Sequence, residues 1–321
     1  MHTELMFFRI IPRHAIWGGP IMHNYFGYNV PAQTGQAWVF SAHKDFTNVC
    51  QNGDYRGQTL AKIWDMAPEL FRSKYEHFPF VVSLVAPAEQ RSVQVHPTDA
   101  VAQAKGFPHG KSEAWVILQA PEDGKLIYGS NSDVKTTTDR ITKEDFAGLF
   151  REIPVHTGDA IYIPDGTIHG LGAGNIAYQI QQVSDHSYRI YDYGRSEVDG
   201  SKRPTAIRDA VDSINSAPEE YNTTLRYVHP DGSDILKKDS FTAHEYIGSS
   251  EFYLSSMTVH GHARMRKQSY WLCTVVKGTG RVNGHTVRFA DNFIIPATVS
   301  RLELRGNFTL MISSEKRIIN V

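Results

Sequence analysis

The sequence contains little cysteine and no apolar segment long enough to cross a membrane. Its two cysteines, Cys50 and Cys273, lie far apart and outside any CxxC motif, which excludes a disulfide framework and a thiolate zinc site. A transmembrane helix needs about 18 consecutive apolar residues, and no such run occurs. The first residues also lack the cationic start and apolar core of a secretory signal. These features predict a cytoplasmic protein without a membrane partner.

The charges of the chain are balanced, with 33 basic and 34 acidic residues and no strongly basic run. This balance argues against nucleic acid or an anionic membrane as the main partner. A small anionic ligand is compatible with it, because such a ligand needs only a few well-placed cations. With 321 residues, 41% of them hydrophobic, the chain is long enough to bury a large core.

Short apolar runs bounded by Gly, Pro and Asn dominate the sequence, and they are typical of an antiparallel sandwich or barrel. The runs are AWVFSA, FPFVVSLVA, SVQVH, EAWVILQA, AIYIP, YQIQQ, FYLSSMTV, YWLCTVVKG, FIIPA and FTLMISS. Helical patterns are fewer and cover residues 57–77, 142–153 and 203–216. Thr142 is the expected N-cap of the second helix, and Pro204 lies near the first turn of the third.

A faint internal repeat indicates the architecture. The segments TGDAIYIPDGTIHGL (157–171) and FADNFIIPATVSRLE (289–303) both contain a short strand that ends in Ile-Pro and is followed by a turn. A strand region interrupted by glycine precedes each of them. The first copy contains His169, and the second has no histidine at that place. We therefore expect the first copy to carry chemistry and the second to be structural, with a boundary near residues 230–250.

The hexapeptide SVQVHP (92–97) places two polar residues inside a strand of apolar character. Alternate side chains of a strand point the same way, so Gln94 and His96 share one face while Val93 and Val95 share the other. Burying a polar group without a partner costs roughly 1–3 kcal/mol. Gln94 and His96 are therefore either a hydrogen-bonded pair in the core or two ligands of a metal ion.

Further along the chain, Gly158, Pro164, Gly166 and His169 form the pattern G-x5-P-x-G-x2-H. This pattern resembles the second signature motif of the cupin superfamily, whose histidine is a metal ligand inside a β-barrel. Gln94 and His96 stand where cupins place their first-motif ligands, and Glu113 follows in GKSEAW. Two oxygen and two nitrogen donors suit zinc or another divalent first-row ion.

The resemblance extends to one family, the type I mannose-6-phosphate isomerases of the short bacterial form. The matching stretches are IWGG (16–19), GQAWVFS (35–41), NG (52–53), FPFVVSLV (78–85), SVQVHP (92–97), GKSEAW (110–115), GDAIYIPDGTIHGLG (158–172), QQVSDHSYRIYDYGR (181–195) and DG (199–200) with Arg203. They run in order over the first 210 residues or so, whereas the last third resembles a degenerate cupin.

The resemblance implies a mainly β fold, a cupin-type barrel or jelly roll with two cupin-like repeats and a few added helices. It implies a catalytic metal-binding domain over residues 1–235 with helical insertions, and a degenerate cupin-like domain over 236–321. It also implies a sugar-phosphate substrate, no nucleic acid partner, and a monomer or weak homodimer.

The family converts mannose 6-phosphate and fructose 6-phosphate into each other with zinc, so the resemblance implies one Zn²⁺ per chain. The implied zinc ligands are Gln94, His96, Glu113 and His169. Lys111 and Arg189 are implied as catalytic and substrate-binding groups, and Arg195 as a further substrate-binding group. These residue types fit a reaction through a cis-enediol, whose negative charge needs a nearby cation. Lys111 shares the strand face of Glu113, and Arg189 offers a bidentate fork for phosphate.

The chain departs from the family pattern at two positions, where Gln36 and Gln179 replace glutamates. A glutamine cannot take up a proton at neutral pH, so an essential base is lost if the family glutamate is that base. This leaves a sugar-phosphate-binding cupin without activity as an alternative. A further alternative is another metal cupin, either a related isomerase or an iron oxygenase that uses His96, Glu113 and His169 as a facial triad. An oxygenase would require neither Gln94 nor Lys111.

Overall fold

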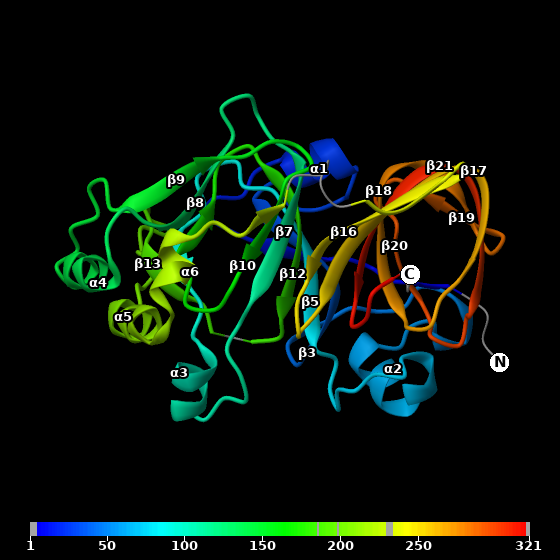
Figure 1. The fold of residues 1–321 in the computed structure, drawn as a ribbon, viewed down its shortest axis with the longest axis horizontal. Helices are drawn as coiled ribbons and strands as arrows, with labels where there is room; N and C mark the ends of the chain where they lie inside the picture. Colours follow the sequence, from blue (N-terminus) through cyan, green and yellow to red (C-terminus); the bar gives the residue numbers. More distant parts are fainter. Residues whose placement is uncertain (1–4, 185, 198, 229–233, 319–321) are drawn as a thin grey trace.

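A computed structural model describes residues 5–184, 186–197, 199–228 and 234–318. Its strands form three sheets in two β assemblies that lie side by side, with short helices around them (Figure 1). This is the mainly β architecture that the apolar runs predict. None of the helices in the described part of the chain is long and apolar enough to span a membrane.

Two facing sheets build the first assembly. One has eight strands in the order β14-β10-β7-β12-β5-β3-β2, with β4 on β3, and the other has five in the order β13-β6-β11-β8-β9. The bounds of the first sheet are β2 Ile11–His14, β3 Thr34–His43, β4 Phe46–Thr47, β5 Phe80–Val85, β7 Glu113–Gln119, β10 Ala160–Ile163, β12 Ile176–Gln182 and β14 Tyr227–Val228. Those of the second are β6 Val93–Val95, β8 Lys125–Ser130, β9 Phe150–Pro154, β11 His169–Leu171 and β13 Tyr188–Tyr191.

The second assembly is an eight-stranded antiparallel sheet with the order β1-β20-β18-β21-β17-β16-β15 and β19 on β18. Its strands are β1 Met6–Phe7, β15 Asp234–Lys238, β16 Phe241–Gly248, β17 Tyr253–Arg266, β18 Trp271–Val282, β19 His285–Arg288, β20 Asn292–Ile295 and β21 Arg301–Ser314. The short N-terminal strand β1 thus pairs with β20 of the C-terminal sheet. The division at residues 235 and 236 stays a prediction, and residues 229–233 beside it lie outside the described part.

The apolar runs of the sequence all fall on strands, and the two copies of the repeat are built alike. In the first copy β10 pairs antiparallel with β7, and in the second β20 pairs antiparallel with β18. Aligned on Pro164 and Pro296, the position of His169 in the first copy corresponds to Arg301 in the second, which is exposed. The second copy therefore presents no metal ligand at this place.

The helices agree less well with the prediction. They are α1 Ile21–Phe26, α2 Leu60–Met66, α3 Asp99–Ala104, α4 Val134–Thr142, α5 Ile207–Ser216 and α6 Glu219–Thr223, with 3-10 turns at Gly53–Tyr55 and Pro68–Leu70. The expected helix over 57–77 is confined to α2 and the second 3-10 turn, because Pro68 cannot continue the α-helix. The expected helix over 203–216 is found as α5, which begins at Ile207.

The helix expected over 142–153 is wrong. Thr142 is the last residue of α4, not an N-cap, and the cap is Asp133, whose side chain accepts a hydrogen bond from Thr136 N at 2.7 Å. Beyond α4 the backbone adopts positive φ at Glu144 (54°) and Gly148 (63°), which no helix tolerates. Residues 150–154 then form β9 against β8.

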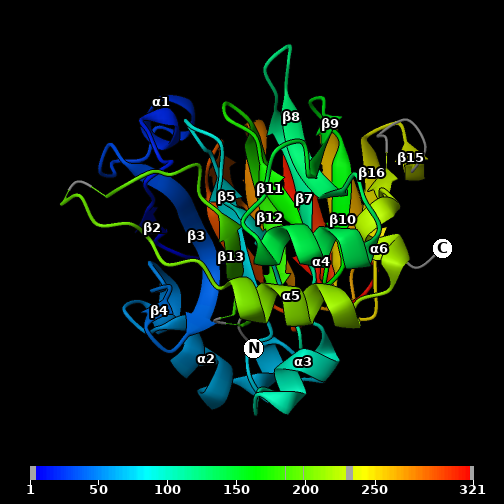
Figure 2. The same ribbon diagram turned by 90° about the vertical axis from the view of Figure 1, so that its left-hand side faces the viewer.

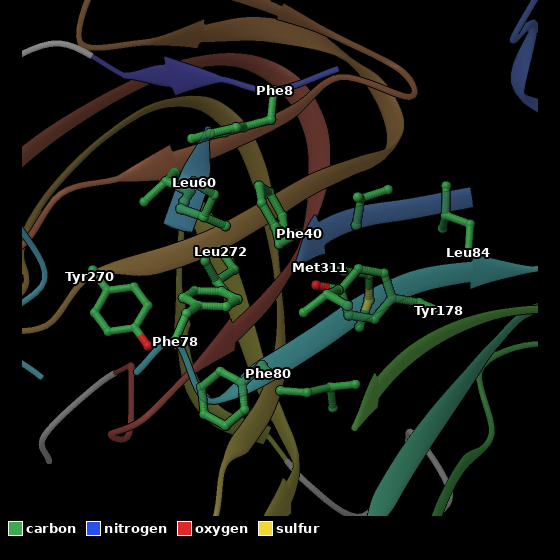
Figure 3. Packing of buried hydrophobic residues seen from close by; sticks show 14 of the residues in the cluster. Phe8, Phe40, Leu60, Phe78, Phe80, Leu84, Tyr178, Tyr270, Leu272 and Met311 are labelled. Atoms are coloured by element: carbon green, nitrogen blue, oxygen red, sulfur yellow. The ribbon is translucent and has the colours of Figure 1, made fainter. Parts of the chain in front are cut away.

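Strand β12 shows how the core positions the inner surface of the first assembly. Ile176, Tyr178 and Ile180 point outward into a core shared with the C-terminal sheet, whose members include Leu272 and Met311 (Figure 3). Tyr178 also hydrogen-bonds Ser313 across this boundary at 3.0 Å. The alternate residues of β12 therefore point to the other face, between the two sheets of the first assembly. The C-terminal sheet supports the first assembly from outside.

Candidate metal centre

Strand β6 has the two faces that its sequence predicts. Val93 and Val95 are buried in an apolar cluster with residues of α4 and α5, for example Ile141 and Ile214. These two helices lie side by side over the five-stranded sheet (Figure 2). The opposite face of β6 carries Gln94, which turns into the space between the two sheets.

Three residues from three segments meet in this space. His96 follows β6, Glu113 begins β7 and His169 begins β11. All three are buried, with exposed fractions of 1%, 0% and 0%. Glu113 Oε2 lies 3.9 Å from His96 Nε2, and Glu113 Oε1 lies 3.3 Å from His169 Nε2. Across the described ranges this is the one group of three His, Cys, Asp or Glu residues with ligand atoms close enough for a metal ion.

The two imidazole rings are oriented as metal ligands. His96 Nδ1 lies 3.2 Å from the carbonyl oxygen of Lys111, and His169 Nδ1 lies 2.9 Å from that of Thr167. A carbonyl oxygen can only accept a hydrogen bond, so each Nδ1 carries the hydrogen and each Nε2 presents its lone pair to the centre. Burial lowers the pKa of both rings, and that of His96 lies well below its usual range. The rings are therefore neutral, as metal ligands must be.

The two oxygens of Glu113 have different surroundings. Oε2 accepts a hydrogen bond of 2.7 Å from Gln179 Nε2. Oε1 is buried and has no hydrogen-bond partner among the described residues. A buried carboxylate oxygen without a partner is costly, and a cation bound between Oε1 and the two Nε2 atoms removes this cost. The residues present thus fit a divalent metal ion.

Gln94 adjoins the same centre. Its Nε2 lies 3.0 Å from His169 Nε2 and 3.4 Å from His96 Nε2. A half-turn of the amide exchanges its nitrogen and oxygen without changing its shape. The side chain is therefore placed to offer Oε1 to an ion held by the three neighbours. All four residues predicted as ligands come together.

Lys111 lies next to this group, on the segment that leads into β7. It is 5% exposed, and its ammonium donates a hydrogen bond of 3.2 Å to Ser187 Oγ. After burial, its positive charge is the largest effect that lowers the pKa of His96. Lys111 thus brings a buried positive charge to the metal centre.

Arg189 belongs to the same row of residues as two of the ligands. Gln94 pairs with His169 on one side and with Arg189 on the other, across β11, β6 and β13. Directly paired residues of an antiparallel sheet share a face, so Arg189 leaves the sheet on the side of the centre. Its guanidinium donates a hydrogen bond of 2.7 Å to Pro204 O. It lies partly exposed, at the edge of the site.

Arg195 is engaged in a different network. Its guanidinium donates to Gln90 O at 2.7 Å and pairs with Asp192 at 2.5 Å. Asp192 also accepts hydrogen bonds from Arg203 and from Ser92 at 2.8 Å. These contacts fix the loop after β13 against the start of β6. Binding of substrate by Arg195 stays a prediction.

Sequence reasoning missed Arg91, which is 8% exposed and is an electrostatic neighbour of Glu113. It lies three positions before Gln94, so strict alternation places it on the opposite face. Because β6 begins only at Val93, alternation does not apply to Arg91. The only signal in the sequence was an arginine directly before a ligand-bearing strand.

The fold and this site define a cupin with a buried group of two histidines and a glutamate. The model of the type I phosphomannose isomerase catalytic domain matches residues 7–122, and that of the mannose-6-phosphate isomerase cupin domain matches residues 242–315. Mannose-6-phosphate isomerase ManA of Bacillus subtilis is 32% identical, over 98% of this chain and 99% of its own. The mannose-6-phosphate isomerase of Streptococcus mutans is 30% identical, over 97% and 98%. The chain belongs to the type I phosphomannose isomerase family.

Solved structures agree with this assignment. The crystal structure of mannose 6-phosphate isomerase from Bacillus subtilis superimposes with a TM-score of 0.88 at 29% identity, covering 96% of this chain and 99% of that one. A variant of phosphomannose isomerase from Salmonella typhimurium gives a TM-score of 0.77 at 12% identity, over 98% and 100% of the two chains. At 12% identity the second likeness concerns the fold alone.

Proposed function

We propose that this chain interconverts mannose 6-phosphate and fructose 6-phosphate with one zinc ion per chain. The observation that carries the zinc proposal is the buried arrangement of His96, Glu113 and His169, with both Nε2 atoms and the unpartnered Oε1 directed to one centre. Nitrogen and carboxylate donors of this number suit zinc. Gln94 would be the fourth ligand, through Oε1.

Zinc bound here would polarise the oxygens at C1 and C2 of the sugar and lower the pKa of a bound water. The residues of the chain have the other tasks. Lys111 would hold a positive charge beside the sugar oxygens while a proton moves between C2 and C1 through a cis-enediol. Arg189, at the edge of the site, would bind the phosphate with its guanidinium fork.

The alternative of a binding protein without activity depends on Gln36 and Gln179. Gln179 donates a hydrogen bond to Glu113, which an ionised glutamate at that position cannot do. Gln36 accepts a hydrogen bond from Trp38 Nε1 at 3.3 Å. Gln179 thus has a role as a neutral hydrogen-bond donor, whereas a glutamate at position 36 could accept the same hydrogen bond. The contact of Gln179 favours an active enzyme in which this position orients Glu113 and is not the base.

A coupled assay of mannose 6-phosphate to fructose 6-phosphate tests the proposal, on zinc-loaded protein and after chelation. We expect turnover that chelation abolishes and zinc restores. The variant His169→Ala is expected to lose zinc and activity together, while His260→Ala, an exposed position on the C-terminal sheet, retains both. Tight zinc and sugar-phosphate binding without turnover would instead identify a binding protein. Oxygen consumption with bound iron would identify an oxygenase.

A further inference from the structure

Arg91 is a buried cation with an unused hydrogen-bond donor. The residue is 8% exposed. Its Nη1 atom is enclosed and has no hydrogen-bond partner among the described residues. A buried charged donor without a partner is costly, and native proteins keep few of them. The position therefore points to a partner beyond the described residues, such as a bound ligand.

Arg91 lies beside the strand that carries His169. Its guanidinium carbon lies 5.5 Å from the centre of the Trp17 ring, which shields it on one side. Its backbone nitrogen donates to Leu171 O at 3.0 Å, which fixes it beside β11, the strand of His169. Burial lowers the pKa of Arg91, and Glu113 is the charge that most opposes this effect.

Glu113 is not the missing partner. Nη1 of Arg91 and Oε1 of Glu113 are both buried, and neither has a hydrogen-bond partner, so they are not bonded to each other. Oε1 is directed to the centre between the two imidazoles, as described above. Arg91 thus adds a second buried positive charge, with Lys111, beside a centre where one carboxylate is the only negative ligand.

We propose that Arg91 is a catalytic residue, whose Nη1 binds a sugar oxygen at C1 or C2 and stabilises its negative charge in the isomerisation. This inference rests on the proposed function. From the aldose, C2 gives its proton to a water molecule in the site, the electron pair of that bond forms the C1–C2 double bond, and the carbonyl electrons move to O1. The hydroxyl proton of O2 then passes to O1, the new carbonyl forms at C2, and C1 takes the proton back from the water. Arg91 stays protonated throughout and exchanges no atoms.

Arg91→Met tests the assignment, because methionine keeps an unbranched side chain and removes the charge. We expect kcat to fall by about 100-fold, the usual effect of losing one donor to a developing oxyanion. Zinc content and the melting temperature should stay near those of the wild type, and KM should change little. Arg91→Lys should recover part of kcat, since it restores the charge without the guanidinium fork.

Lys267→Met is the matched control, because Lys267 also has a buried basic side chain, 4% exposed, but directly follows β17 of the C-terminal sheet and donates to Ser269 O and Pro296 O. A merely structural Arg91 would give the same pattern as Lys267→Met, a lower melting temperature with unchanged kcat. That result would overturn the assignment. So would a loss of activity in Arg91→Met that only follows its zinc content.

Binding of a hydroxamate that mimics the enediolate separates this inference from the proposed function. Calorimetry on zinc-loaded protein measures the affinity for the hydroxamate. In Arg91→Met this affinity should fall by the same factor as kcat/KM, and in Lys267→Met it should be unchanged. If the wild type does not turn over mannose 6-phosphate, the proposed function fails while the hydroxamate still tests Arg91. Equal hydroxamate affinity for wild type and Arg91→Met would then overturn the role of Arg91.

Discussion

Gln179 Nε2 donates a 2.7 Å hydrogen bond to Glu113 Oε2, the carboxylate of the candidate metal centre. The amide is held in this orientation because its Oε1 accepts a hydrogen bond of 3.0 Å from Ser83 Oγ. Ser83, Gln179 and Glu113 thus form a buried polar chain across β5, β12 and β7. The glutamine that departs from the family pattern fixes the orientation of the Glu113 carboxylate.

Replacing Gln179 by glutamate should therefore weaken metal binding instead of restoring a base. The Gln179→Glu variant sets a second buried carboxylate against Glu113, so one of the two must take up a proton. We expect zinc affinity to fall by about 10–100-fold, as for other partners of metal ligands, and activity at limiting zinc to fall with it. Zinc titration in a competing chelator measures the effect.

Gln36→Glu is the control for this experiment, because Gln36 is the other glutamine at a family glutamate and bonds Trp38. It should bind zinc as the wild type does. A gain of activity in Gln179→Glu at saturating zinc would contradict this role of Gln179 and would revive the idea of a lost base.

Removing the charge of Lys111 should reduce catalysis without removing the metal. Lys111→Met takes a buried positive charge from beside His96, and we expect kcat/KM to fall by about 100-fold at unchanged zinc content. Lys125 is an exposed lysine of β8 that pairs with Glu152 of β9 at 3.4 Å. The variant Lys125→Met is expected to have wild-type kinetics. Wild-type rates in Lys111→Met would exclude a role for this ammonium in the reaction.

Asp165 should make the protein less stable as the pH rises. Burial, and then the charge of Asp99, raise the pKa of Asp165 from 3.8 to about 6. Between these two pKa values the folded state holds a proton that the unfolded state has released. The stability that this proton gives to the folded state is fully present below about pH 4 and is lost as the pH rises through 6. The full shift corresponds to about 3 kcal/mol, and partial exposure reduces this figure.

The variant Asp165→Asn should accordingly have a higher melting temperature than the wild type at pH 7.5, with a smaller difference at pH 4.5. Asn keeps an oxygen to accept the hydrogen bond from Asp99 N, which is 3.2 Å long. Asp139→Asn, at an exposed position of α4, should show no such dependence. An equal gain at both pH values would mean that ionisation of Asp165 is not the cause.

Asp192 should be important for stability, because it joins Arg195, Arg203 and Ser92. Burial disfavours its charge, yet the hydrogen bonds from these three residues together lower its pKa. Asp192→Asn leaves two arginines without their carboxylate and should cost roughly 2–3 kcal/mol of unfolding free energy at pH 7. Denaturant unfolding measures this loss.

The pH dependence of this effect has a definite sign. A lowered carboxyl pKa stabilises the folded protein above the unfolded value and loses this contribution as the pH falls through the folded value. The difference between wild type and Asp192→Asn should therefore shrink below about pH 4. Asp145→Asn, which removes an exposed ion pair with Arg140, should have a much smaller effect at pH 7. Equal effects of the two variants would show that the Asp192 network is not a stabilising one.

Local pattern was sufficient to predict the strands and the residues that meet in the candidate metal centre. Alternation places Val93 and Val95 in the apolar layer and Gln94 in the interior, since successive residues of a strand face opposite sides. The turn from Pro164 to His169 joins β10 to β11. Its length places His169 at the start of β11, where the side chain faces Glu113. Such features depend on neighbours in sequence, and the sequence therefore determines them.

The helix over 142–153 was predicted wrongly because Phe146 and Leu149 have helical spacing, while positive φ at Glu144 and Gly148 breaks the helix. Such a break is decided by packing against β8 and α5, which no local pattern contains. The hydrogen bonds of Gln179 to Glu113 and of Ser92 to Asp192 likewise join distant parts of the chain. The order of residues along the chain was enough to predict the fold class, the repeat and the residues that meet in the candidate metal centre. Which buried charges meet depends on the three-dimensional packing, because the stability of a buried charge depends on every group that surrounds it.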